Sequence, residues 1–108
     1  MKVKIPKEIK IGARIYKVGF KDNLLRDDAN RGQVYWHKQE MELSPNLHPQ
    51  QLSVTFLHEC IHIIDEHIGA RIGLTEENTT ALSEGLYQLL KDNLDIEFDW
   101  SEIYQLGG

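Results

Sequence analysis

The stretch TFLHECIHIIDEHIG, residues 55–69, places two histidines four positions apart within a largely apolar segment. Pro49 suits the first position of a helix, and His48 before it can serve as the cap. From there apolar residues recur at helical spacing at Leu52, Val54, Leu57, Ile61, Ile64 and Ile68. Further apolar residues cover a second side, which is typical of a buried helix. We therefore expect a buried helix over residues 49–68, ended by Gly69.

The two histidines of this helix are spaced for a metal ion. Residues four apart lie on the same side of a helix, so His58 and His62 direct their imidazoles toward one point. Zinc accepts imidazole nitrogen at about 2.0–2.1 Å, so one ion can bridge the pair. Glu59 lies about 100° round the helix, which suits a general base better than a ligand. Polar groups this dense on an apolar helix are costly without a partner, which favours a metal site over chance.

A second helix is expected to begin after Thr75 and to end near Asn93. Its apolar stripe is Leu82, Leu86 and Leu89, and we take Leu82 as the centre of the buried face. Glu76 then lies about 100–120° from that centre, on the flank of the buried face. We therefore predict Glu76 as the third metal ligand, looking into a site shared by the two helices.

Other carboxylates compete for this role. Glu77 and Glu84 come out opposite the expected buried face, so we interpret Glu77 as an acid that stabilises the helix N-terminus. Asp65 lies on the side of His58 and His62, but almost two turns beyond His58. It suits an outer role, accepting the second ring N–H of His62. If no glutamate of the second helix binds the metal, Asp65 becomes the leading choice.

The first half of the chain has strand periodicity. Apolar and polar residues alternate over residues 9–18, with Gly12-Ala13 as a turn, and QVYWHKQEMELS, residues 33–44, fits a hairpin. The tail around residues 96–100 alternates again. We predict an α+β fold, a small antiparallel sheet packed on two main helices, with residues 1–108 as a single domain.

The composition excludes several classes of protein. A net charge of −5 argues against a nucleic-acid interface, and the lysine-rich start fits a solvated edge strand. The first residues lack the apolar core of a signal peptide, and no apolar run approaches the roughly 20 residues of a membrane span. The lone cysteine, Cys60, points into the core and fits a reducing compartment. We expect a cytoplasmic protein; its oligomeric state stays open.

The motif also carries a family resemblance. The run Phe56-Leu57-His58-Glu59-Cys60-Ile61-His62, followed by a second helix led by Glu76, resembles the minimal gluzincin-like metallopeptidases, especially the ImmA/IrrE-like group. A looser match is LSEGL, residues 82–86, which lacks the ending that those proteins show there. The chain also looks like short proteins of phages and mobile elements in Gram-positive bacteria, over residues 8–93. Because ImmA/IrrE-like proteins cut a cognate repressor, the resemblance implies an intracellular regulatory substrate.

We thus expect a zinc-dependent endopeptidase that acts on a protein or peptide. His58, His62 and Glu76 would hold Zn²⁺, and Glu59 would be the catalytic base. A substrate strand could pair along the edge formed by residues 39–44, QEMELS.

The alternative is a non-catalytic, metal-stabilised protein-binding module of a phage or mobile element. The fourth coordination position separates the two hypotheses. A site closed by a fourth protein ligand, such as Asp65 or His67, would be structural, whereas an open position favours an enzyme.

Overall fold

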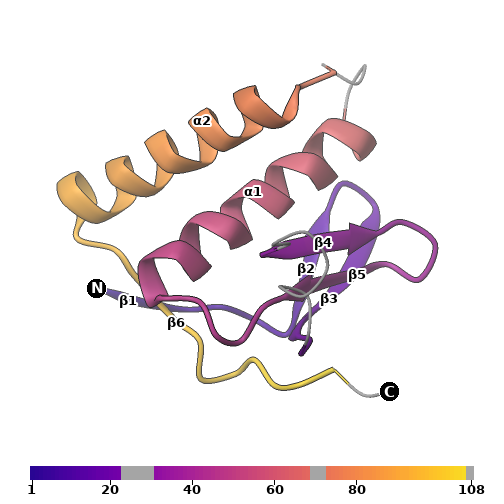
Figure 1. Ribbon diagram of the computed structural model, residues 1–108, viewed down its shortest axis with the longest axis horizontal. Coiled ribbons are helices and arrows are strands. Elements are labelled where there is room, and N and C mark those ends of the chain that lie inside the picture. Colours follow the sequence, from indigo (N-terminus) through magenta and orange to yellow (C-terminus); the bar gives the residue numbers. More distant parts are fainter. Residues whose placement is uncertain (23–30, 69–72, 107–108) are drawn as a thin grey trace.

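The computed structural model describes residues 1–22, 31–68 and 73–106, which form two helices and two small sheets. In chain order the elements are β1 (Lys2–Lys4), β2 (Glu8–Ile11), β3 (Arg14–Phe20), β4 (Gly32–Tyr35), β5 (Glu40–Leu43), α1 (Pro49–His67), α2 (Glu76–Gln88), the π-helical turn η2 (Leu89–Asn93) and β6 (Glu97–Asp99). Figure 1 shows α1 between α2 and the four-stranded sheet. The predicted α+β class is confirmed.

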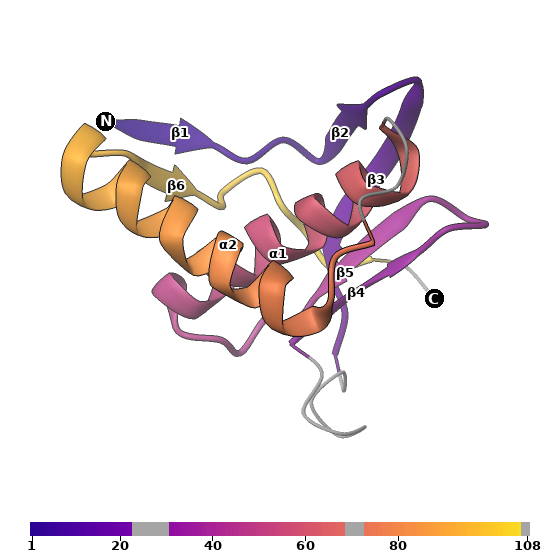
Figure 2. The ribbon, with the colours of Figure 1, turned by 90° about the horizontal axis from the view of Figure 1, so that it is seen from above.

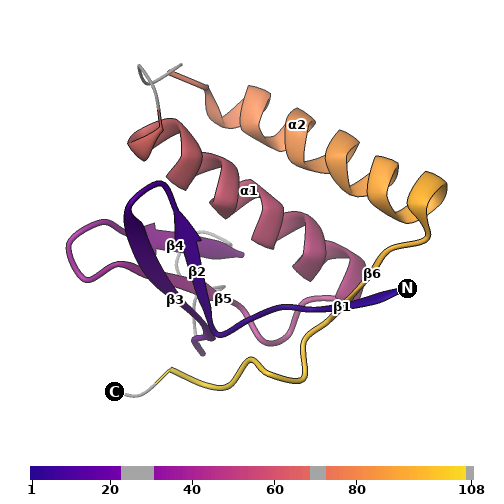
Figure 3. The same ribbon diagram turned by 180° about the vertical axis from the view of Figure 1, so that it is seen from behind.

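The larger sheet has the strand order β2-β3-β5-β4. Two antiparallel hairpins, β2–β3 and β4–β5, are joined through a parallel pairing of β3 with β5. A second, two-stranded sheet pairs β1 with β6 in parallel and lies beside the C-terminal end of the segment formed by α2 and η2 (Figures 2 and 3). The sequence indicated antiparallel strands alone. Because β5 is an interior strand, the predicted substrate edge at residues 39–44 is wrong, and among the described strands β4 forms the edge on that side.

Both hairpin turns lie where the sequence predicts them. Gly12 has φ +62° in the turn between β2 and β3, a left-handed conformation that glycine adopts without steric cost. Gln39 takes φ 50° in the turn between β4 and β5. The two turns therefore lie at the positions that the alternation predicted, one around Gly12-Ala13 and one centred on His37-Lys38.

Helix α1 begins as predicted and covers one face of the four-stranded sheet. Pro49 lies in its first turn, and the Nδ1 atom of His48 accepts a hydrogen bond from the Gln50 backbone N–H at 3.2 Å. The helix ends at His67, and the predicted terminator Gly69 lies outside the described residues. Its inner side joins the sheet in one core, whose fully buried members include Tyr16, Met41, Leu43 and Ile63.

One glycine brings the sheet edge close to α1. A Cβ atom added to Gly32 would lie 2.9 Å from the Thr55 Cγ2 atom of α1, too close for an ordinary contact. Glycine at this position therefore lets the start of β4 pack directly on the helix that carries the two histidines. This close packing defines one wall of the site described below.

Helix α2 begins as predicted but turns a different face inward. The Thr75 side chain caps it by accepting from the Asn78 backbone N–H at 3.0 Å, and helical structure continues through η2 to Asn93. Its buried residues are Thr79 and Ser83, not the leucines. Leu82 is 52% exposed, so taking it as the centre of the buried face was wrong.

Small hydroxyl residues can fill this interface because their polar atoms are satisfied locally. Thr79 Oγ1 donates to the Thr75 carbonyl at 2.8 Å, and Ser83 Oγ donates to the Thr80 carbonyl at 2.9 Å. A buried hydroxyl that is hydrogen-bonded carries little desolvation penalty. No helix among the described residues is long and apolar enough to cross a membrane.

Candidate metal centre

Three side chains predicted as metal ligands meet between α1 and α2. The Nε2 atoms of His58 and His62 lie 3.0 Å apart. Oε1 of Glu76 lies 2.6 Å from His62 Nε2 and 3.3 Å from His58 Nε2. All three ligand atoms fall within 4.8 Å of one another, so the group could hold a metal ion.

The geometry and the donor set fit zinc. Two nitrogens bound at about 2.0–2.1 Å in a tetrahedron lie about 3.3 Å apart, close to the separation of the imidazoles here. The side chains of His58 and His62 are 15% and 25% exposed, whereas that of Glu76 is 72% exposed. The centre is therefore enclosed on the α1 side and open to solvent beside Glu76.

The protonation states favour metal binding. Burial lowers the pKa of His58, which outweighs the opposing effect of Glu76, so the imidazole is neutral and can coordinate. Burial alone would raise the pKa of Glu76, but His58 and His62 outweigh it and lower that pKa. The carboxylate is therefore ionised, as a ligand must be.

A threonine supports the first histidine from the other side. Oγ1 of Thr80 lies 3.4 Å from His58 Nδ1, the ring nitrogen that faces away from Glu76. With Nδ1 protonated, the ring donates to the hydroxyl and leaves Nε2 free to coordinate, which fixes the tautomer. Sequence reasoning missed this residue, although Thr80 follows Glu76 by one helical turn and so shares its face.

Glu59 lies beside the centre rather than in it. Its side chain is buried, with the residue only 6% exposed, yet it lines the same cleft as the ligands. Burial, and then the negative charge of Glu76, raise the pKa of Glu59 from 4.5 to about 7. Glu59 does not belong to the group of side chains that could hold the ion.

The predicted alternatives to Glu76 are engaged elsewhere or lie apart. Asp65 accepts hydrogen bonds from the backbone N–H groups of Gly73 at 2.9 Å and Leu74 at 3.3 Å. No hydrogen bond between Asp65 and the expected donor His62 is found in the described part of the chain, and Asp65 instead secures the segment that leads into α2. Glu77 is exposed and belongs to no metal group among the described residues.

The remaining candidates also have defined places. Nε2 of His67 is hydrogen-bonded to the Tyr16 hydroxyl at 2.5 Å, so it does not close the metal site. Glu84 lines the cleft, which the assumed helix register had not predicted. Burial raises the pKa of Cys60 to about 12, and its thiol packs against the core as expected.

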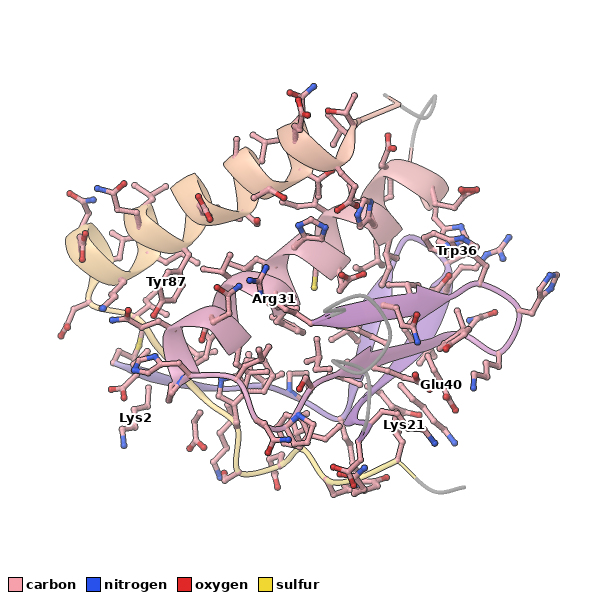
Figure 4. All side chains as sticks on the ribbon, viewed as in Figure 1. Lys2, Lys21, Arg31, Trp36, Glu40 and Tyr87 are labelled. Atoms are coloured by element: carbon pink, nitrogen blue, oxygen red, sulfur yellow. The ribbon has the colours of Figure 1, made fainter. Side chains whose placement is uncertain are left out.

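The centre opens into a cleft of about 760 Å³ between β4, α1 and α2. Arg31 and Trp36 lie at the two ends of β4 (Figure 4), and both line this cleft. Sequence reasoning assigned neither residue to the site, because their place in it depends on the pairing of β4 with β5.

The open edge of β4 borders the cleft. The Ser44 N–H donates to the Arg31 carbonyl at 2.9 Å, and the register pairs Gln33 with Glu42. Hydrogen-bonded and non-hydrogen-bonded pairs alternate in an antiparallel ladder, so Gly32 and Val34 direct their N–H and C=O groups away from β5. Both residues line the cleft.

Comparison with protein-family models, curated proteins and solved structures gave no match. The function is therefore inferred from the site itself, a His-x₃-His and Glu group that could hold a metal ion.

Proposed function

We propose that this protein is a zinc-dependent endopeptidase. The observation that carries the proposal is the group of three donors that lines an open cleft, with a buried carboxylate beside it. Asp65 and His67, the two side chains named as possible fourth ligands of a structural site, are hydrogen-bonded elsewhere. Three protein ligands with an accessible fourth position are typical of catalytic zinc, whereas structural zinc has four protein ligands.

Each residue then has a defined task. His58, His62 and Glu76 would hold the ion, which when bound would supply a Lewis acid for a water and for the peptide carbonyl oxygen. Glu59 takes a proton from the attacking water as the new C–O bond forms. Its carboxyl then passes that proton to the amide nitrogen as the C–N bond breaks. A base whose pKa lies near the working pH suits both steps.

The substrate is proposed to add a strand to β4. The outward N–H and C=O groups of Gly32 and Val34 offer main-chain hydrogen bonds to an extended peptide, as in other strand-addition complexes. A protein substrate is therefore favoured over a small molecule. By the resemblance of its motif to ImmA/IrrE-like peptidases, we propose an intracellular regulatory protein, which also places the enzyme in the cytoplasm.

Metal analysis and peptide cleavage test this function together. Protein purified without a histidine tag should carry about one zinc per chain, and His62→Ala should lose it. The loaded protein should cut members of a mixed peptide library, and Glu59→Gln should not. Wild-type protein that cannot be loaded with zinc would refute the proposal.

A second candidate is a metal-stabilised binding module, favoured by one observation. Leu82, Leu86 and Leu89 form an exposed apolar stripe along α2 and η2. Exposed apolar surface of this kind can mark a protein contact. In that case zinc loading would raise the stability of the protein, and no library peptide would be cut.

A further inference from the structure

A second hollow adjoins the cleft at Trp36. It has a volume of about 610 Å³, and Trp36 lines both spaces. Its other walls come from Ala13 in the β2–β3 turn, from Arg14 at the start of β3, from His37, and from Glu66 and His67 in the last turn of α1. Since His62 and His58 lie about one and two turns before Glu66 on α1, the hollow lies beyond the centre along the same helix.

Trp36 is an exposed aromatic ring held in a fixed orientation. It is 41% exposed, and its ring packs edge-to-face on those of Tyr16 and His67, at centroid distances of 6.4 and 5.7 Å. Tyr16 is fully buried, and its hydrogen bond to His67 ties the two supporting rings together. An indole that is held by two packed rings and is still partly exposed is pre-organised for binding, because little conformational entropy is lost when a ligand contacts it.

The position of Trp36 places it in the path of an added strand. It follows Tyr35, the last residue of β4, so a peptide paired with the outward groups of Gly32 and Val34 runs toward it. Figure 4 shows Trp36 beyond one end of β4 and Arg31 at the other. The hollow can therefore receive a side chain from one side of the cleaved bond only.

We propose that this hollow is a side-chain subsite for a large apolar or aromatic residue of the peptide substrate, with Trp36 as its wall. The inference rests on the proposed peptidase function and names a feature of its substrate. Aromatic pairs and apolar burial supply the attraction. Arg14 and Glu66 both line the hollow and carry opposite charges, so neither sign of charge on a substrate side chain is favoured.

The test uses a library of short blocked peptides that vary between Phe, Ala and Lys at each position. With zinc-loaded wild type, cleavage should favour Phe over Ala by about tenfold or more at one position on one side of the bond. Trp36→Ala should lose this preference, and Trp36→Phe should keep part of it. Tyr104→Ala removes an exposed aromatic ring away from the cleft and should keep all of it.

Binding of the same peptides to zinc-loaded Glu59→Gln separates this inference from the proposed function. Discrimination between Phe and Ala in binding, without cleavage by the wild type, would support the subsite and overturn the peptidase. Equal binding of all peptides, no binding, a preference for Lys, or an unchanged preference in Trp36→Ala would overturn the subsite.

A readout that needs no substitution covers the case in which Trp36→Ala does not fold. The chain has two tryptophans, so fluorotryptophan labelling gives two ¹⁹F signals. The signal of Trp36 should shift on addition of a Phe peptide, while that of Trp100, which packs on Phe56 and Phe98, should not. A shift of neither signal at saturating peptide would overturn the proposal.

Discussion

Replacing Glu59 with glutamine should make the metal-free protein more stable at neutral pH. Glu59 is almost fully buried, and burial raises its pKa from 4.5 to about 7. The folded state therefore binds this proton more tightly than the unfolded state does. The stability that the bound proton of Glu59 contributes is fully present below about pH 4.5. It is lost as the pH rises toward and through about 7. At 1.36 kcal/mol per pKa unit, the loss is about 3 kcal/mol.

Glutamine has the same shape and does not titrate, so Glu59→Gln should escape this loss. In the presence of a chelator, urea denaturation at several pH values should show a difference between variant and wild type that grows by about 3 kcal/mol from acid to pH 8. Other titrating groups are common to both proteins and cancel in the difference. A difference that stays flat with pH would refute the burial argument.

The same variant separates the base from the ligands once zinc is added. Glu59→Gln should retain about one zinc per chain and lose turnover by about 10²- to 10⁴-fold, because it cannot accept a proton. His58→Ala is the matched control and should lose the metal. Equal loss of zinc in the two variants would mean that Glu59 is a ligand.

The remaining predictions concern α2 and its attachment. Glu76→Ala should weaken zinc affinity about tenfold or more, as measured by metal titration, whereas Glu77→Ala should cost only about 0.3–1 kcal/mol of stability, as measured by denaturation. Loss of zinc in Glu77→Ala alone would contradict the assignment. Asp65→Ala should also weaken zinc binding, by about tenfold, because it frees the start of α2, and Asp65→Asn, which keeps a carbonyl acceptor, should recover part of the affinity. Unchanged zinc affinity in Asp65→Ala would refute the role of Asp65 in holding the start of α2. Ser83→Leu should cost about 1–3 kcal/mol by overpacking the helix interface, while Leu82→Ser should change stability by only about 0.5 kcal/mol; the reverse order would mean that the leucines face inward.

Local signals in the sequence were enough for most of the elements. Pro49 with His48 located the start of α1, and alternating residues around Gly12 and after His37 located the two hairpins. Each of these signals acts within a few residues of itself. The parallel pairing of β3 with β5, and of β1 with β6, joins segments far apart in the chain, and no local pattern specifies such a pairing.

The face that α2 turns inward could not be predicted from hydrophobic periodicity. That method assigns the apolar stripe to the core, but Thr79 and Ser83 are buried here and Leu82 is not. The hydroxyls escape the rule because each bonds to a carbonyl of its own helix segment. The prediction that Glu76 meets the histidines named a residue that does lie there, although the register used to reach it was wrong.

The packing of α2 and the geometry of the metal centre both depend on which face of α2 packs against α1. A glutamate side chain is short, so its carboxylate reaches two imidazoles on another helix only if the helices lie close together. Interhelical distance depends on the side chains at the contact, and Thr79 and Ser83 are small enough to permit a close approach. Leucines at the contact would hold α2 farther from α1 and carry the Glu76 carboxylate away from His62. The leucine stripe is thus exposed because the small residues of α2 face α1, which the two-helix site requires. A larger residue at Ser83 should therefore weaken zinc binding as well as stability.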